Sequence, residues 1–371
     1  MAFAFPTYRH PALVTYGTGS VKSLASSIDQ QTVVFMSGSP PVADYLRRAW
    51  AKSGPQLDDL TVFTKPVGEP TWRSVQDTAT SLTDVQVNRI VAIGGGAVLD
   101  WARLVWAASV GAVNAAGLEA GDWTEARQRV SMVLVPTTCG SGAEAASVAV
   151  YLLDGRKVPV VSPILLADHV VLDSKFLATV SEFTLACSLA DALSHALEAW
   201  MSIVPGRLPR EAALSCFRLI LREEPHHERT ARLMDAGFLG GVAAAHCSVG
   251  VVHAFAHSMA RHGLGHGHAN ALALRPALRR LIELPAAVAL TRELGVGARE
   301  LDAQIERLTA PAVCDASSRH AVAVLSSRAD RRALMEAMVA DPCMRTCPAS
   351  FSLPDLEALL DDVRDGVTQR C

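Results

Sequence analysis

The residues best suited to chemistry lie in the second half of the chain, as histidines and carboxylates at helical spacing. Asp191 and His195 are four residues apart in an Ala- and Leu-rich run, which places both side chains on one face of a helix. Five histidines then fall within sixteen residues: His253, His257, His262, His266 and His268. The first two repeat the four-residue spacing. One carboxylate with two or three imidazoles is a donor set for zinc or iron(II).

The segment around the last of these histidines has two further features. Glycines alternate between positions 263 and 267, on both sides of His266, and this spacing predicts that His266 lies in a loop. Arg261 and His262 precede that loop. A cation there suits a substrate that carries a carboxylate, phosphate or phosphonate. The alternative is an arginine that points to solvent or pairs with a carboxylate.

Two glycine-rich turns follow strand-like runs in the first half. Residues 89–93 run into Gly94-Gly95-Gly96-Ala97-Val98-Leu99-Asp100, and residues 130–135 run into Pro136-Thr137-Thr138-Cys139-Gly140-Ser141-Gly142. Glycine lets the backbone approach a ligand, and a helix that begins there offers unpaired N–H groups to a pyrophosphate. The triple glycine alone is equally compatible with a plain tight turn. Two such loops after neighbouring strands favour a nucleotide-binding crevice.

The elements that must position these residues differ between the two halves. Strand-like runs at 32–36, 59–63, 89–93 and 130–135 alternate with helical stretches at 42–52 and 75–82. This alternation predicts a parallel sheet with helices on both faces. From residue 181 onward, apolar residues recur at three- and four-residue spacing, which predicts helices only. We therefore predict an α/β, Rossmann-like dinucleotide-binding domain at 1–178 and an all-helical metal-binding and substrate domain at 179–371.

Composition narrows the class of protein. The chain has 371 residues and a formal net charge of −3, which argues against a nucleic-acid-coating protein because such proteins carry a basic excess. Its most apolar stretch, 104–118, is shorter than the roughly 20 residues that a membrane span needs. No basic start followed by an apolar run marks a signal peptide, so we expect a cytoplasmic protein with eight reduced cysteines. Cys343 and Cys347 are the only close pair, and no second pair completes a zinc site.

Taken in order along the chain, these motifs resemble the iron-containing (group III) alcohol dehydrogenase family. The shared landmarks are Tyr16–Gly19, Gly94–Asp100, Pro136–Glu144, Leu166–Asp173, Asp191–Glu198, His253–His257 and His266–Ala271. The resemblance implies an N-terminal dinucleotide-binding domain and a C-terminal helical domain, the architecture shared with dehydroquinate synthase, with the active site in the cleft between them. It also implies a homodimer or a larger oligomer.

The resemblance assigns roles to individual residues. It implies one divalent metal, iron(II) or zinc(II), held by Asp191, His195, His253 and His266, with His257 as the catalytic residue that relays a proton. It implies that the glycine-rich turns line the cofactor through Gly94, Gly95, Gly96, Ala97, Thr137, Thr138 and Ser141, with Asp100 supporting the first turn. Ala97 replaces the family's usual serine, and Ser258-Met259-Ala260 replaces its usual Pro-Leu-Gly. Substrate identity is therefore not transferred from well-known members.

The turn after the first buried strand bears on the choice of cofactor. NAD-specific relatives commonly place an acidic residue there, which holds the ribose 2′-OH and repels a 2′-phosphate. This chain has Ser37-Gly38-Ser39 and no acid at that turn. Together with Lys157 as a cation nearby, the turn favours NADP(H) over NAD(H).

These features predict a metal-dependent, NAD(P)H-linked oxidoreductase that reversibly reduces a small aldehyde or ketone. Arg261 and His262 favour an anionic substrate such as a phosphono-carbonyl compound. Two other classes stay open: a dehydroquinate synthase-like or glycerol dehydrogenase-like metalloenzyme on the same fold, and a non-catalytic binding protein. Net consumption of NADPH would distinguish the proposed oxidoreductase from the dehydroquinate synthase-like class. The intact set of metal ligands argues against a non-catalytic binding protein. We expect no nucleic-acid or membrane partner.

Overall fold

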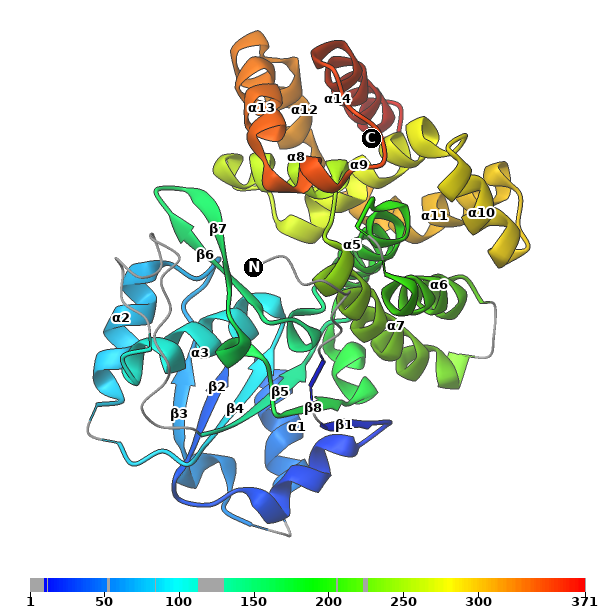
Figure 1. The fold of residues 1–371 in the computed structure, drawn as a ribbon. Coiled ribbons are helices and arrows are strands. Elements are labelled where there is room, and N and C mark those ends of the chain that lie inside the picture. The colour runs from blue at the N-terminus through cyan, green and yellow to red at the C-terminus, as the bar shows by residue number, and fades with distance from the viewer. Residues whose placement is uncertain are drawn as a thin grey trace.

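The β-branched runs of the first half form a six-stranded parallel sheet in the order β1-β8-β5-β4-β2-β3 (Figure 1). The computed structural model describes residues 10–11, 13–51, 54–83, 85–112, 130–204, 206–222 and 226–370. The strands are β1 (Leu13–Tyr16), β2 (Thr32–Met36), β3 (Thr61–Thr64), β4 (Arg89–Gly94), β5 (Ser131–Pro136) and β8 (His169–Leu172). The parallel α/β fold predicted for this half is confirmed.

The central strands are buried on both faces, and each face has its own apolar cluster. Val34 belongs to a cluster packed by α1 (Pro40–Trp50), whereas its neighbour Phe35 belongs to a cluster packed by α2 (Trp72–Ser81) and α3 (Gly96–Ser109). Successive side chains of a strand point to opposite faces of the sheet. A strand covered on both faces is apolar at nearly every position, and such a run is readable in the sequence.

The direction of the connections reverses at the centre of the sheet. β2 pairs with β3 on one side and with β4 on the other, and β4 pairs next with β5. In parallel sheets, ligands bind beyond the carboxyl ends of the strands where this reversal occurs. The turns that follow β2 and β4, Ser37-Gly38-Ser39 and Gly94-Gly95-Gly96, border this point.

Two more strands, β6 (Val148–Leu153) and β7 (Arg156–Val161), form an antiparallel hairpin that projects from the sheet half (Figure 1). Asp154-Gly155 turns the chain between them, with φ of 50° and 73°. Positive φ at both positions is the hairpin geometry that an Asp-Gly dipeptide favours. β7 contacts α8 (Val251–Met259), so the hairpin reaches the helical half of the molecule. We predicted no strand in this segment from the sequence.

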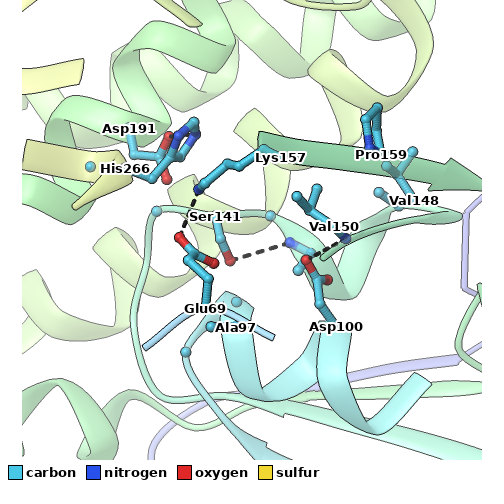
Figure 2. A pocket seen from close by; sticks show the side chains of 18 of the residues that line it. Glu69, Ala97, Asp100, Ser141, Val148, Val150, Lys157, Pro159, Asp191 and His266 are labelled. Atoms are coloured by element: carbon cyan, nitrogen blue, oxygen red, sulfur yellow. Dashed lines mark hydrogen bonds and ion pairs between the residues drawn. The ribbon is translucent and has the colours of Figure 1, made fainter. Parts of the chain in front are cut away.

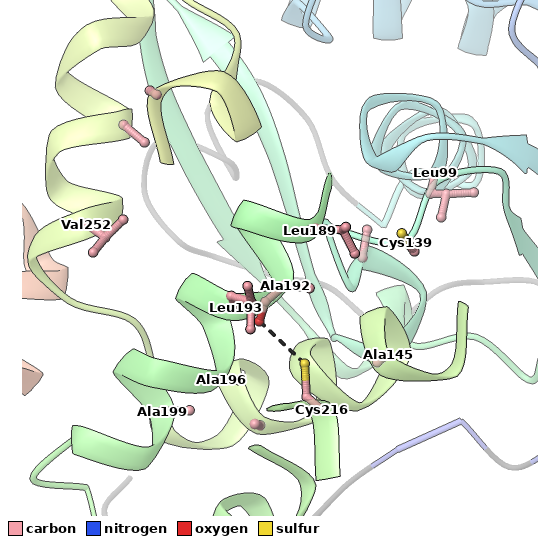
Figure 3. Close-up of a cluster of buried hydrophobic side chains, with 14 of the residues drawn as sticks. Leu99, Cys139, Ala145, Leu189, Ala192, Leu193, Ala196, Ala199, Cys216 and Val252 are labelled. Atoms are coloured by element: carbon pink, nitrogen blue, oxygen red, sulfur yellow. Dashed lines mark hydrogen bonds between the residues drawn. The ribbon is translucent and has the colours of Figure 1, made fainter. Parts of the chain in front are cut away.

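Every regular element described from α5 onward is helical, as predicted. The remaining helices are α5 (Glu182–Met201), α6 (Arg207–Leu221), α7 (His226–Cys247), α9 (His266–Leu281), α10 (Pro285–Leu294), α11 (Ala298–Val313), α12 (Ser318–Ser326), α13 (Arg328–Ala340) and α14 (Leu353–Thr368), with the 3-10 turns η6 (Ala260–His262) and η7 (Pro342–Thr346). One apolar cluster joins the sheet half to the helical half (Figure 3). It includes Leu99 of α3 and Cys139 from the first half and Leu189 of α5 from the second. The domain boundary at residue 178 falls just before α5 and stays a prediction.

Among the described residues, no single helix is long and apolar enough to cross a membrane. One bent pair, Glu228–Cys247 with Val251–His262, meets the criteria of length and composition only when both helices are taken together, with a bend of 100° between them. The apolar stretch at 104–118 is described only as far as residue 112.

Candidate metal and nucleotide site

Asp191, His195 and His253 meet at one buried point. The first two lie on α5, four residues apart on one face as predicted, and His253 comes from α8. Each residue offers one ligand atom, and these three atoms lie within 4.8 Å of one another. Asp191 Oδ1 lies 3.6 Å from His253 Nε2 and 3.9 Å from His195 Nδ1. All three side chains are buried.

His266 approaches the same carboxylate from α9. Its Nε2 lies 3.6 Å from Asp191 Oδ1, and its ring centroid is 5.2 Å from that of His253. The predicted loop around His266 is wrong, because α9 begins at this residue and Gly267 is already helical. A Cβ on Gly267 would lie 2.7 Å from the carbonyl oxygen of Cys187 on α5. This glycine therefore allows two helices to pack closely and does not mark a turn.

Several buried polar atoms at this point lack a hydrogen-bond partner in the described part of the chain. They include His253 Nε2, His266 Nδ1 and Asn270 Oδ1. Asn270 Nδ2 donates to Asp191 Oδ1 at 2.7 Å, which helps to fix the carboxylate. An unpaired buried polar group costs about 1–3 kcal/mol, so such a cluster is expected to have a ligand.

The charges of the cluster suit a cation. Burial raises the pKa of Asp191, but the three imidazoles around it outweigh burial and hold that pKa well below its ordinary value. Burial lowers the pKa of His195 to about 4 and holds that of His266 well below its ordinary range. Burial also lowers the pKa of His253, but Asp191 and Glu198 outweigh it and raise the value to about 9. The ionised carboxylate of Asp191 and the neutral imidazoles of His195 and His266 are in the protonation states that metal ligation requires. The raised pKa of His253 shows that its surroundings favour a positive charge.

Glu198 orients His253, a contact that we did not predict. His253 Nδ1 donates to Glu198 Oε2 at 2.6 Å, and the backbone N–H of Val252 donates to Oε1 at 2.6 Å. A carboxylate on one ring nitrogen fixes the tautomer and directs the other nitrogen toward a metal. The sequence carried a signal for this contact, because Glu198 lies seven residues after Asp191 and therefore on the same face of α5.

His257 lies one turn beyond His253 on α8 and has its own carboxylate partner. Its ring stacks on that of His266 with centroids 5.5 Å apart. Its Nδ1 donates to Asp341 Oδ2 at 2.9 Å. Asp341 stands where α13 ends and η7 begins, so 84 residues separate the two partners in the chain. No pattern in the sequence links residues that far apart.

The two glycine-rich turns pack directly on each other at the start of α3. Gly95 precedes the helix, and no side chain caps its first N–H groups. A Cβ on Gly96 would lie 2.6 Å from Ser141 Oγ, and one on Gly95 would lie 3.5 Å from Thr138 Oγ1. The turns thus form a cradle of bare backbone and hydroxyl groups at a helix N-terminus, an arrangement suited to a pyrophosphate.

One cavity of about 890 Å³ connects this cradle with the histidine cluster. Of the predicted cofactor residues it is lined by Ser37, Gly38, Gly95, Gly96, Ala97, Asp100, Thr138, Ser141 and Lys157, and of the predicted metal and catalytic residues by Asp191, His195, His253, His257 and His266. The predicted residues that do not line it are Ser39, Gly94, Thr137, Arg261 and His262.

Arg261 and His262, which the sequence predicts beside the substrate, lie outside the cavity lining. Residues 260–262 form the 3-10 turn η6, in which Arg261 is exposed to solvent outside the cavity lining. The carbonyl oxygen of His262 accepts a hydrogen bond from His320 Nε2 at 2.8 Å. The cations that line the cavity are Lys65, Lys157 and Arg345.

The β6–β7 hairpin covers one side of the cavity (Figure 2). Lys157 of β7 extends toward Asp191 and His266, and its Nζ lies 2.7 Å from Glu69 Oε1. Asp100 Oδ2 accepts a hydrogen bond from the backbone N–H of Val150 at 2.9 Å, so Asp100 ties α3 to β6. These contacts place the hairpin between the two ends of the cavity.

Known proteins match nearly the whole chain. A profile described as "Iron-containing alcohol dehydrogenase" matches residues 11–174, and one described as "Fe-containing alcohol dehydrogenase family, C-terminal" matches residues 185–319. 1-Propanol dehydrogenase PduQ of Salmonella typhimurium is 27% identical over 94% of this chain and 96% of its own. Long-chain-alcohol dehydrogenase 1 of Geobacillus thermodenitrificans is 29% identical over 57% of this chain, and the match spans 56% of that relative, just over half its length.

Solved structures share the fold. An iron-containing alcohol dehydrogenase from Thermococcus thioreducens superposes with a TM-score of 0.84 at 19% identity, over 97% of this chain and 100% of its own. Sulfoacetaldehyde reductase from Bifidobacterium kashiwanohense, solved with NAD+, gives a TM-score of 0.82 at 18% identity, over 98% and 99%. At such identities the likeness establishes the fold alone.

Proposed function

The chain belongs to the iron-containing alcohol dehydrogenase family, and from that premise we propose that it is a metal-dependent, nicotinamide-linked oxidoreductase. The proposed reaction is the reversible reduction of a small aldehyde or ketone to an alcohol. The cavity that joins the glycine-rich cradle to the cluster around Asp191 is the observation that supports this reaction most. A dinucleotide held at the cradle would extend toward a metal held at the cluster, within one cavity.

The residues at the cluster fit a divalent metal. We propose that Asp191, His195, His253 and His266 hold it, and the buried His253 Nε2 without a hydrogen-bond partner supports that fit. One oxygen and three nitrogen donors accept iron(II) and zinc(II) alike. When bound, the metal supplies Lewis acidity toward the carbonyl oxygen and the nicotinamide supplies the hydride.

The side chains of the protein position the reactants and move a proton. Glu198 holds His253 in one tautomer, and the N–H groups at the start of α3 are placed to bind a pyrophosphate. Asp341 binds Nδ1 of His257, which leaves Nε2 available to a group in the cavity. We assign to His257 the transfer of a proton to the substrate oxygen as the carbonyl is reduced.

For the cofactor we propose a preference for NADP(H) over NAD(H). The turn Ser37-Gly38 lines the cavity without an acidic side chain that would repel a 2′-phosphate. Lys65 also lines the cavity, and its backbone N–H donates to the carbonyl oxygen of Met36 at 2.9 Å, while its Nζ donates to the carbonyl oxygens of Pro66 and Gly68. Lys157, the cation that the sequence predicts near the turn, is paired with Glu69 and extends toward His266.

For the substrate we propose an anionic carbonyl compound, of which a phosphono-carbonyl compound is one example. Support comes from Arg345 of η7, which lines the cavity on the same turn as Cys343. A guanidinium pairs well with carboxylate or phosphonate oxygens. Acetaldehyde and phosphonoacetaldehyde compared side by side test this choice, and equal kcat/KM values for the two would refute it.

A pair of variants tests the proposed reaction. His253→Ala is expected to lose both metal and turnover, whereas His257→Ala is expected to keep the metal and lose most of its turnover. Metal analysis and NADPH oxidation with an aldehyde panel, on one sample of each protein, give both values. Full metal occupancy in His253→Ala would overturn the ligand assignment. No oxidation of NADPH or NADH by the metal-loaded wild type with any carbonyl compound would overturn the function.

A further inference from the structure

The described residues contain one further group of metal-ligating side chains besides the Asp191 cluster. His257 on α8, Asp341 at the end of α13 and Cys343 in η7 each offer one ligand atom, and these atoms lie within 4.8 Å of one another. All three residues are partly buried. His257 and Cys343 line the cavity, so a cation has access to the group from the same space as the substrate.

Asp341 is the centre of this group. Its Oδ2 accepts a hydrogen bond from His257 Nδ1 at 2.9 Å, and its Oδ1 accepts one from the backbone N–H of Cys343 at 2.8 Å. Cys343 Sγ also lies within 4.8 Å of the ligand atoms of Asp341 and His257. An imidazole N–H and a thiol therefore lie beside one carboxylate. A cation that enters between them finds three donors already gathered.

We propose that His257, Asp341 and Cys343 form a second metal site, for a thiophilic divalent cation such as zinc(II), and that its occupation inhibits the enzyme. The Asp191 cluster offers only oxygen and nitrogen, whereas this group adds a sulfur donor, which favours zinc over harder cations. A carboxylate and a thiolate together carry two negative charges and so balance a dication. Binding releases the thiol proton of Cys343 to solvent, and the neutral ring of His257 carries its one proton on Nε2 so that Nδ1 is free to ligate.

The inhibition follows from the place of His257 in both groups. A histidine whose Nδ1 ligates zinc cannot take up a second proton, so it cannot form the imidazolium that would give a proton from Nε2 to a substrate oxygen at neutral pH. Its ring also stacks on His266, with centroids 5.5 Å apart, so a cation held here stands beside the proposed catalytic metal. The inhibition rests on the proposed function, whereas binding of the cation does not.

Cobalt(II) added to the iron(II)-loaded, full-length protein under anaerobic conditions tests the binding. Thiolate ligation to cobalt gives a near-ultraviolet charge-transfer band, which carboxylate and imidazole ligands do not give. We expect about one equivalent of cobalt per chain with this band. Cys343→Ser is expected to lose the band and to raise the Kd for cobalt by more than about tenfold. Asp341→Asn provides a second variant, which is expected to weaken binding while the thiol is retained.

Cys187 provides the matched control, because it lines the same cavity from α5. Cys187→Ser is expected to keep the cobalt band, and a band lost in this variant but kept in Cys343→Ser would overturn the proposal. Absence of any thiolate band in the wild type would overturn it as well. Zinc added to the iron-loaded enzyme is expected to lower turnover, at a concentration more than about tenfold higher for Cys343→Ser than for the wild type.

The second metal site and the proposed function can be refuted independently of each other. Normal carbonyl-dependent NADPH oxidation without a thiolate band would contradict the second metal site alone. A thiolate band in a protein that oxidises no reduced nicotinamide with any carbonyl compound would contradict the proposed function alone.

Discussion

Replacement of Gly96 by alanine tests whether the two glycine-rich turns form the cofactor cradle. The added Cβ would lie 2.6 Å from both Cβ and Oγ of Ser141, closer than such atoms approach in proteins. Asp100 and Arg103 anchor α3 through buried hydrogen bonds, including the one from Val150 to Asp100. We therefore expect α3 to stay in place and the turn that carries Ser141 to move away, which opens the cradle.

The size of the effect follows from the cost of overpacking. Adding a methyl group to a filled site costs about 1–3 kcal/mol. Because about 1.4 kcal/mol corresponds to a tenfold change in affinity, the Kd for NADPH is expected to rise roughly 5- to 150-fold if the bound state carries the whole cost. The free energy of unfolding is expected to fall by no more than about the same 1–3 kcal/mol.

Fluorescence titration of NADPH measures this change, with thermal unfolding as a check on folding. Adding Ser141→Gly to Gly96→Ala removes the clashing Cβ and is expected to restore affinity to that of Ser141→Gly alone. Adding Ser141→Ala keeps the Cβ and is expected to restore nothing. Gly366→Ala controls for the substitution itself, since a Cβ there meets open space on α14. Wild-type affinity in a folded Gly96→Ala protein would refute the cradle.

Three further predictions follow from individual contacts. Glu198→Gln is expected to weaken metal binding by about 10- to 100-fold, because a neutral amide oxygen holds the His253 Nδ1–H less strongly than the carboxylate does and adds no negative charge to the imidazole; equilibrium dialysis measures this, and an unchanged affinity would contradict it. Burial raises the pKa of Glu144 from its ordinary 4.5 to about 7, so the folded state binds this proton more tightly than the unfolded state does. The free energy of unfolding is therefore expected to fall, by up to about 3 kcal/mol, as the pH rises from about 4.5 to about 7. Glu144→Gln should therefore have a higher Tm than the wild type above about pH 7 and no advantage near pH 4, whereas a constant difference at all pH values would speak against a buried carboxyl. Gly38→Asp is expected to shift the ratio of kcat/KM values from NADPH toward NADH by at least about tenfold, because the new charge repels a 2′-phosphate; a wild type that already prefers NADH would refute the premise.

The features that could be predicted from the sequence are those set by local periodicity. Strand β2 is buried at every position because both faces of the sheet are covered, and the β-branched and apolar run TVVFM makes its bounds readable from its residues. Asp191 and His195 share a face of α5 because four residues make about one helical turn. The same rule extends to Glu198, two turns after Asp191, and the contact with His253 was therefore within reach of sequence reasoning.

The features that could not be predicted depend on tertiary packing. Asp341 meets His257 only because η7 packs on α8, and nothing in the sequence signals a contact between positions that are 84 apart. Arg261 was expected at the substrate, but the 3-10 turn after α8 leaves it exposed, and Arg345 from a distant turn lines the cavity instead. The glycines around His266 indicated a loop, whereas Gly267 serves close packing between helices. Glycine marks both situations, and only the fold distinguishes them.

Carbonyl-dependent oxidation of NADPH by the purified protein, before and after removal of its metal, tests most directly the claim that one cavity joins a nicotinamide to the Asp191 cluster. We predict oxidation with at least one small aldehyde, its loss on chelation, and its return when iron(II) or zinc(II) is added to the wild type but not to His253→Ala. Oxidation that continues undiminished after complete removal of the metal would contradict the account.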